Sequence, residues 1–167
     1  GMMVWGVVGW KNSGKTGLVE RLVAEVSARG LAVSTVKHAH HAVDVDQPGT
    51  DSHRHRQAGA REVILASASR WALMAELRGA DEPGLDALLA RLSPADLVLV
   101  EGYKREGHAK VEAHRRATGQ PLLATGDPTI RAVATDSPDD VARDWTGPIL
   151  PLDDTRAVAD FMLGTAA

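Results

Sequence analysis

Residues 3–16 read MVWGVVGWKNSGKT, and their pattern is the most informative in the sequence about the fold. The run at residues 3–8 is apolar and partly β-branched, which predicts a short buried strand. Apolar side chains then recur at helical spacing over residues 14–29, and a glycine-rich loop lies between the two segments. A loop in this position directs several backbone N–H groups at one point, next to the amino terminus of a helix. The stretch therefore predicts an anion-binding loop between a strand and a helix.

The loop matches the Walker A pattern GxxxxGK[ST] over residues 9–16. Its two glycines allow the backbone to approach phosphates closely, Lys15 supplies a cation, and Thr16 supplies a hydroxyl for Mg²⁺. We therefore expect a purine nucleoside triphosphate with Mg²⁺, and we count Lys15 among the catalytic residues. The expected nucleotide-binding residues are Gly9, Trp10, Lys11, Asn12, Ser13, Gly14, Lys15, Thr16 and Gly17. A glycine-rich turn that precedes a helix by chance is the alternative, which the flanking strand and helix disfavour.

A second apolar run, residues 97–100, ends in Glu101 and suits a strand that is buried on both faces. An acid after such a strand can ligate Mg²⁺ or accept a hydrogen bond from water bound to the ion. Asp96, at the other end of the run, is the rival, and a plain surface carboxylate is the alternative for Glu101. Ligands bind at the carboxyl ends of parallel strands, so we favour Glu101 as the metal-site acid.

The remaining pattern predicts an α/β protein with a three-layer P-loop NTPase fold, a mainly parallel sheet and an antiparallel hairpin extension. The hairpin is expected from residues 62–66 and 70–77. Further strands are expected at residues 31–36, 110–114, 122–124 and 131–135, and further helices at residues 51–59, 84–91 and 154–163. The length of 167 residues predicts one domain over residues 2–167, with Gly1 expected as a remnant of tag removal.

Composition excludes several classes of function. The chain has no cysteine, which rules out disulfides, thiolate catalysis and cysteine-based metal sites and suits a reducing compartment. A net charge of -3 and the lack of a long Lys/Arg block argue against nucleic acid as a partner. The opening apolar run is too short to span a membrane, and no targeting segment is visible. We therefore expect a cytoplasmic protein with neither nucleic acid nor membrane as a partner.

The polar stretch at residues 37–60 carries most of the histidines together with several aspartates. Its cluster consists of His38, His40, His41, His53, His55, Asp44, Asp46 and Asp51. Such a cluster is compatible with an ordinary polar loop or with a Zn²⁺ or Ni²⁺ site, although the spacing matches no tight ligand pattern. A third interpretation is a switch that becomes ordered when a γ-phosphate and Mg²⁺ are bound.

Asp51 is the best catalytic candidate in this stretch, because its carboxylate can orient the attacking water or a water on Mg²⁺. Lys37 or His38 can face the same phosphate from the end of the preceding strand. Arg54 and Arg56 are candidates for charge stabilisation, but we favour solvated charges on a helix. Trp71 is expected to be an ordinary core or surface aromatic residue.

Beyond the Walker A motif, five further segments are distinctive. They read TVKHAHH at residues 35–41, DQPGTDS at residues 46–52, AGA at residues 58–60, RWAL at residues 70–73 and LVEGYK at residues 99–104. Together these segments resemble the molybdopterin-guanine dinucleotide biosynthesis adaptor protein family, MobB, over most of residues 3–115. The resemblance implies a homodimer that binds GTP, has weak GTPase activity, and assists the molybdopterin guanylyltransferase.

Carried over by position, the resemblance implies that residues 9–16 hold the phosphates of GTP and that Thr16, Asp51 and Glu101 surround Mg²⁺. The family often has Lys where Thr50 stands, so no charge is expected at that position here. The usual guanine-reading motif, Asn-Lys-x-Asp, is missing, and Asp136 after a predicted strand is a positional candidate for contact with the guanine edge.

Two other functions stay open at the level of sequence. The histidine cluster would suit a metal-delivering P-loop GTPase of the nickel-chaperone type, although the lack of cysteine argues against it. A small-molecule kinase or ligase would use the long polar loop to bind an acceptor, but no acceptor pocket can be recognised in the sequence.

Overall fold

The computed structural model describes residues 2–39, 46 and 50–165. Contacts between Cα atoms divide the chain into two compact units, one of residues 1–38 and 85–167 and the other of residues 39–84. The strands of the first unit are β1 (Met3–Val8), β2 (Val33–Lys37), β5 (Leu97–Glu101), β6 (Lys110–His114), β7 (Ile130–Thr135) and β8 (Ile149–Pro151). Its helices are α1 (Lys15–Ala28), α3 (Leu85–Leu89), α4 (Pro138–Ala142) and α5 (Thr155–Leu163), with 3₁₀ turns η1 (Arg116–Thr118) and η2 (Ala124–Gly126).

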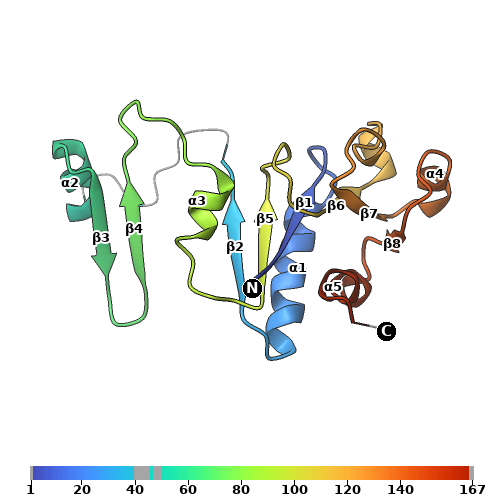
Figure 1. Cartoon of the computed structure of the whole chain (residues 1–167), viewed down its shortest axis with the longest axis horizontal. Helices are drawn as coiled ribbons and strands as arrows, with labels where there is room; N and C mark the ends of the chain where they lie inside the picture. Colours follow the sequence, from blue (N-terminus) through green and yellow to red (C-terminus); the bar gives the residue numbers. More distant parts are fainter. Residues whose placement is uncertain (1, 40–45, 47–49, 166–167) are drawn as a thin grey trace. The chain divides into compact units, whose positions relative to one another are not determined.

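The first unit contains one six-stranded sheet in the order β2-β5-β1-β6-β7-β8 (Figure 1). Every neighbouring pair of its strands is parallel, so all six carboxyl ends lie at one edge. The chain adds β2 and β5 on one side of β1 and β6, β7 and β8 on the other. Ligands of such sheets bind where the order reverses, which here is at the carboxyl end of β1.

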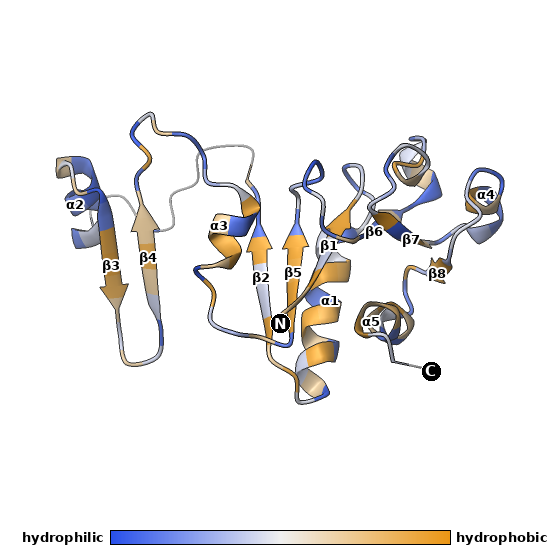
Figure 2. Cartoon of the chain, in the orientation of Figure 1, coloured by the Kyte–Doolittle hydropathy of each residue, from blue (hydrophilic) through white to orange (hydrophobic). Residues whose placement is uncertain are grey.

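Strand β5 shows how the sequence builds three layers. Side chains alternate between the faces of a strand, and β5 is apolar at every position before its last residue. Leu97 and Leu99 belong to a core cluster that includes α1 and α5, whereas Val98 and Val100 pack with Leu85 of α3. The hydropathy colouring shows β1 and β5 as largely hydrophobic and α1 as mixed (Figure 2). The predicted α/β fold with a parallel sheet between two helical layers is confirmed.

Most predicted elements of this unit are present, but the prediction of one strand is wrong. Residues 122–124 form no strand; they lead into η2, because the carboxylate of Glu112 accepts hydrogen bonds from the backbone N–H groups of Leu123 and Ala124. These two groups are therefore unavailable to a sheet. The short elements α4 and β8 were not predicted from sequence. Among the described residues, no helix is long and apolar enough to cross a membrane.

The second unit consists of α2 (Asp51–Ala58) and the antiparallel pair β3 (Glu62–Ala66) and β4 (Trp71–Ala75), which confirms the predicted hairpin. Arg56 is mostly buried, and its guanidinium pairs with Asp46 and, at 2.6 Å, with Glu76. The expectation of a solvated charge at Arg56 is therefore wrong. This side chain links α2 to Asp46, which precedes the helix, and to Glu76, which follows β4. Val63 and Met74 pair across the strands and are the buried apolar residues of the hairpin.

Candidate functional site

The loop between β1 and α1 has a backbone that requires glycine at two positions. Gly14 has φ +90°, in the left-handed region that glycine adopts without strain. At Gly9, an added Cβ would lie 2.4 Å from Ser13 Oγ and 2.7 Å from the carbonyl oxygen of Ala113. The loop is thus folded tightly on itself and against the end of β6, in a form that fits the close approach of a backbone to phosphate.

The polar groups of the loop are directed as an anion site requires. Lys15 Nζ donates a hydrogen bond to the carbonyl oxygen of Gly9 at 3.0 Å, so the ammonium lies over the loop. Gly14 caps α1 without any side chain, and the first N–H groups of the helix receive no side-chain cap. Ser13 is 2 % exposed, yet its Oγ has no hydrogen-bond partner among the described residues. Buried polar atoms without partners are rare in proteins, so this hydroxyl fits a loop that binds a ligand.

Thr16 and Glu101 meet at the carboxyl edge of the sheet. Thr16 Oγ1 donates a hydrogen bond to Glu101 Oε1 at 2.7 Å, and Glu101 is 8 % exposed. The Nζ atom of Lys37, the last residue of β2, lies 4.0 Å from Glu101 Oε2. A hydroxyl and a carboxylate beside a phosphate loop are oxygen ligands of the kind that Mg²⁺ prefers. The two groups fit the ion, which would supply charge neutralisation at the terminal phosphates.

Asp96 has a different role from Glu101. It precedes β5 at the opposite edge of the sheet, and its Oδ2 atom accepts a hydrogen bond from the backbone N–H of Ala32 at 2.7 Å. Its own N–H donates to the carbonyl oxygen of Ala32 at 2.9 Å. Asp96 thus fixes the entry into β2 and β5, and Glu101 is the acid of this strand at the carboxyl edge.

The candidates from the histidine-rich stretch are divided between the two units, with His53 and His55 on α2, and three of them lie outside the described residues. His38 ends the first unit, where its N–H donates to the carbonyl oxygen of Glu101 at 2.9 Å and its ring lies 4.7 Å from that of Tyr103. Asp51 begins α2 in the second unit, and its place beside Mg²⁺ stays a prediction. His40, His41 and Asp44 lie outside the described residues. Within residues 2–39, 46 and 50–165, no group of three His, Asp or Glu side chains is arranged to hold a metal ion.

Two residues that sequence reasoning missed lie close to the loop. Glu112 is fully buried on β6, and its two bonds to the backbone of residues 123 and 124 hold the segment that precedes η2. Burial raises the pKa of the Glu112 carboxyl. The carbonyl oxygen of Pro121 in the same segment accepts a hydrogen bond from Trp10 Nε1 at 2.8 Å. A carboxylate between the apolar residues Val111 and Ala113 of a predicted strand was the available signal, since such groups are rarely buried without partners.

Arg115 is the second missed residue. It directly follows β6, and its guanidinium lies against Gly14 of the loop, with Cζ 2.9 Å from the position that a Cβ of Gly14 would occupy. Its place after a parallel strand, at the edge where ligands bind, was the sequence signal.

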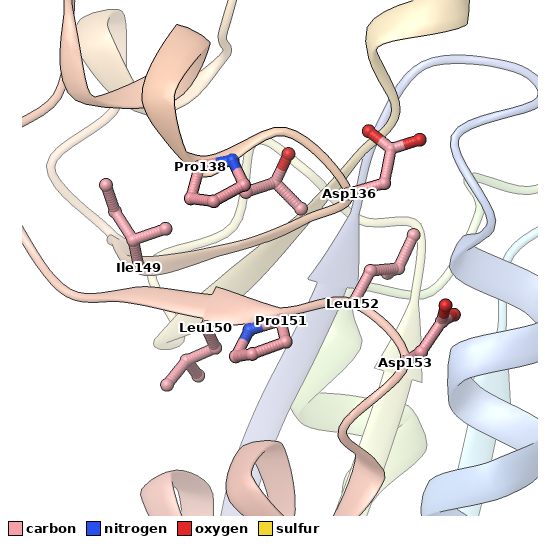
Figure 3. A pocket seen from close by; sticks show the side chains of 8 residues that line it. Asp136, Pro138, Ile149, Leu150, Pro151, Leu152 and Asp153 are labelled. Atoms are coloured by element: carbon pink, nitrogen blue, oxygen red, sulfur yellow. The ribbon is translucent and has the colours of Figure 1, made fainter.

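Among the described residues, two of the hollows along the carboxyl edge lie near the predicted site. One, of about 520 Å³, is lined by Trp10, Lys11, Asn12, Ala117, Thr118 and Gln120. The other, of about 330 Å³, is lined by residues that follow β7 and by β8 (Figure 3). In the second hollow Pro138 lies across from Pro151, and the carboxylates of Asp136 and Asp153 stand toward one end (Figure 3). Asp136 Oδ1 accepts a hydrogen bond from the backbone N–H of Arg116 at 3.0 Å.

Comparison with known proteins identifies the family. The model of the family described as "Molybdopterin guanine dinucleotide synthesis protein B" matches residues 4–136. The chain is 41% identical to the molybdopterin-guanine dinucleotide biosynthesis adapter protein of Escherichia coli (strain K12), over 92% of this chain and 87% of that protein. It is 40% identical to the protein of the same name from Haemophilus influenzae, over 94% of this chain and 85% of the relative.

Solved structures agree with the sequence comparison. A crystal structure of molybdopterin-guanine biosynthesis protein B (mobB) matches with a TM-score of 0.73 and 27% identity, covering 96% of this chain and 98% of that chain. The crystal structure of Bacillus subtilis MobB also gives a TM-score of 0.73, at 25% identity, covering 98% of this chain and 97% of that chain. The family match spans the phosphate loop, Glu101 and Asp136 in a single segment, and the chain belongs to the molybdopterin guanine dinucleotide synthesis protein B (MobB) family.

Proposed function

We propose that this protein is a GTP-binding adaptor in the synthesis of molybdopterin guanine dinucleotide. The observation that carries the proposal is the hydrogen bond between Thr16 and Glu101 beside a tightly folded phosphate loop, in a chain of the MobB family. Residues 9–17 would bind the phosphates, and Thr16, Glu101 and Asp51 would surround Mg²⁺. The relatives that match over most of their length are named as adapter proteins of this synthesis. A metal-delivering GTPase and a small-molecule kinase are accordingly not favoured.

The proposed base is guanine. Strands in a sheet are about 4.8 Å apart, so β7 lies roughly 10 Å from β1 along the same edge. A nucleotide whose phosphates occupy the loop can therefore place its base over the ends of β7 and β8. Asp136 stands at the end of β7, and its Oδ1 atom is held by the N–H of Arg116. A carboxylate is the group that accepts hydrogen bonds from both N–H donors on the guanine edge.

A substitution at Asp136 tests the choice of base. Asp136→Asn replaces an acceptor oxygen by a donor, so we expect roughly tenfold to a hundredfold weaker binding of GTP. Binding of xanthosine triphosphate, which carries an oxygen in place of the guanine amino group, should improve in the variant. Titration calorimetry with both nucleotides and with ATP measures these changes. Unchanged GTP affinity, or equal affinity of the wild-type protein for GTP and ATP, would remove guanine from the proposal.

Hydrolysis is proposed to be slow and secondary to the adaptor role. Lys15 would stabilise charge on the terminal phosphates, and Asp51 would orient the attacking water. The proposed enzyme partner is the molybdopterin guanylyltransferase, and the proposed place of action is the cytoplasm. The absence of cysteine is compatible with that reducing compartment.

The protein is further proposed to act as a homodimer. One face of the β3–β4 hairpin carries Ile64, Ala66, Trp71 and Leu73, in which Ile64 is paired with Leu73 and Ala66 with Trp71. Ile64 is 65% exposed and Trp71 is 68% exposed. Apolar groups that are contiguous and exposed mark interaction surfaces, and a two-stranded sheet is only marginally stable without a cover. A second copy of this chain presents the same face and can cover it.

Two measurements together test the adaptor proposal. Nucleotide affinity with and without Mg²⁺ should show preference for GTP, and immobilised protein loaded with GTP should capture purified molybdopterin guanylyltransferase. The Lys15→Ala variant serves as the unloaded control in the capture. A protein that shows no preference for GTP and captures no guanylyltransferase would not be an adaptor of this kind.

A further inference from the structure

Arg115 occupies a position that the proposed GTP site has not used. It is the first residue after β6, whose carboxyl end lies beside that of β1. A Cβ added to Gly14 would lie 2.9 Å from both Cζ and Nη2 of Arg115 and 3.1 Å from its Nε. The Nε–Cζ–Nη2 side of this exposed guanidinium therefore lies beside the last glycine of the phosphate loop. This proximity is possible because position 14 has no side chain.

The backbone around Arg115 is held in place. Its carbonyl oxygen accepts hydrogen bonds from the N–H of Thr118 at 3.1 Å and from the hydroxyl of the same residue at 3.0 Å. The next residue, Arg116, donates its N–H to Asp136 and places its own guanidinium 3.2 Å from Asp140. The side chain of Arg115 thus starts from a fixed point, and its neighbour already has a carboxylate partner.

The guanidinium of Arg115, in contrast, makes no hydrogen bond or ion pair with any residue that the structure describes. Its surroundings are positive, because the ammonium of Lys15 and the amino terminus of α1 belong to the same loop. Positive groups at the same loop repel one another, and a bound anion reduces that repulsion. The buried Ser13 Oγ without a partner is an independent sign that the loop is completed by a ligand.

We propose that Arg115 is a second phosphate-binding cation, which contacts the polyphosphate of the nucleotide together with Lys15. The inference rests on the proposed nucleotide site and adds a binding residue to it. Arginine suits the position because its planar fork donates two parallel hydrogen bonds to phosphate oxygens. The contact is with phosphate rather than with the base, because the guanidinium lies on Gly14 and not at the hollow of Asp136.

Binding measurements on the full chain test the proposal. Arg115→Met keeps the apolar stem and removes the charge, and it should weaken GTP binding by roughly tenfold to a hundredfold. Inorganic tripolyphosphate with Mg²⁺, which has no base or sugar, should lose affinity by a similar factor. Arg115→Lys keeps the charge without the planar fork, so its affinities should lie between those of the wild-type protein and those of Arg115→Met. Raising the salt concentration should weaken GTP binding less in Arg115→Met than in the wild-type protein, because one contact between opposite charges is missing.

Controls separate this role from a structural one. Arg131→Met removes an exposed arginine near the start of β7 and should leave both affinities unchanged. Thermal unfolding of Arg115→Met should match that of the wild-type protein. If Lys15→Ala abolishes GTP binding and Arg115→Met leaves it intact, the role of Arg115 is overturned and the proposed nucleotide site is not. A loss for GTP without a loss for tripolyphosphate would also overturn that role. A wild-type protein that binds neither ligand would overturn the inference and the proposed nucleotide site together.

Discussion

The hydrogen bond between Thr16 and Glu101 shows how distant residues reach one place. The two lie 85 positions apart in the chain, yet Val7 pairs with Glu101 in the register of β1 and β5. The strand pairing therefore sets the distance, and the side chains need only extend from the edge. Apolar burial of β5 provides the energy, because its first four side chains are fully buried. The polar site is in this sense a consequence of the core.

At Lys15 we expect a loss of binding without a loss of fold. Lys15→Ala removes the ammonium over the loop, so triphosphate affinity should fall by more than roughly a hundredfold. The melting temperature should move by less than about 2 °C, because the side chain is not part of the core. Calorimetry and thermal unfolding measure the two quantities. Retained affinity would contradict the assignment of this lysine.

At Glu101 we expect an effect on the metal rather than on the nucleotide. Glu101→Gln keeps an oxygen for Thr16 but removes the charge, so the Mg²⁺ concentration for half-maximal binding should rise roughly tenfold to a hundredfold. Nucleotide binding in EDTA should change little. Asp96→Asn is the matched control at the opposite end of β5 and should keep the wild-type Mg²⁺ dependence. If both variants respond alike, another acid holds the ion.

Among the elements, those with a local cause were predictable from sequence. β1, the phosphate loop and β5 were found because their apolar pattern and glycines act within a few residues. The strand expected at residues 122–124 failed because a residue on another strand, Glu112, takes its backbone N–H groups. The elements α4 and β8 are only five and three residues long, too short for a periodic pattern. Arg115 was missed because its neighbour in space, Gly14, is 101 positions away in the sequence.

The segment that leads into β6 contains a partly buried histidine, His108, whose ring nitrogens are both buried, and its protonation makes stability depend on pH. His108 packs on β1, where a Cβ at Gly6 would lie 2.5 Å from its Nε2, and neither ring nitrogen has a hydrogen-bond partner among the described residues. Burial, with the nearby positive charge of Lys110, lowers the pKa of His108 to about 4, although Asp127 opposes the shift. The unfolded chain therefore binds this proton at a higher pH than the folded chain does.

The sign of the effect follows from this difference. The stabilisation by neutral His108 is complete above pH 6.5 and is lost as the pH falls from 6.5 toward about 4. His108 contributes at most about 1.4 kcal/mol per pH unit to the slope of the unfolding free energy against pH. His108→Leu should flatten the urea-unfolding free energy over this interval, whereas His55→Leu on the exposed face of α2 should not. Identical pH profiles for the wild-type and His108→Leu proteins would show that the pKa of His108 is the same in the folded and unfolded chains, and would contradict the prediction.

At the scale of the whole molecule, the second unit is an insertion between two neighbouring strands. The chain leaves the sheet after β2, continues through the second unit (residues 39–84), and re-enters the sheet at β5, which pairs with β2. A hairpin with one short helix is too small to bury a core of its own. We therefore still propose that residues 2–167 unfold as one domain, with a single cooperative transition.

Self-association is the prediction for the exposed hairpin face. Trp71→Glu places a charge on that face and should weaken dimerisation by more than about tenfold. Leu77→Glu is the matched control, since Leu77 is an exposed apolar residue that follows β4. Sedimentation equilibrium of the three proteins over a range of concentrations gives the dissociation constants. A wild-type protein that stays monomeric, or a Trp71→Glu protein that dimerises normally, would exclude this face.

The last strand of the large sheet has a consequence for aggregation. Leu152 donates its N–H to Thr135 on β7, so the preceding residue, Pro151, faces the outer border of β8. Proline has no N–H to offer there, and β8 is only three residues long. A strand from another molecule that aligned with this border would find too few donors to continue the ladder. The sheet therefore ends at β8 instead of growing from one molecule to the next, and this border is protected against fibril formation.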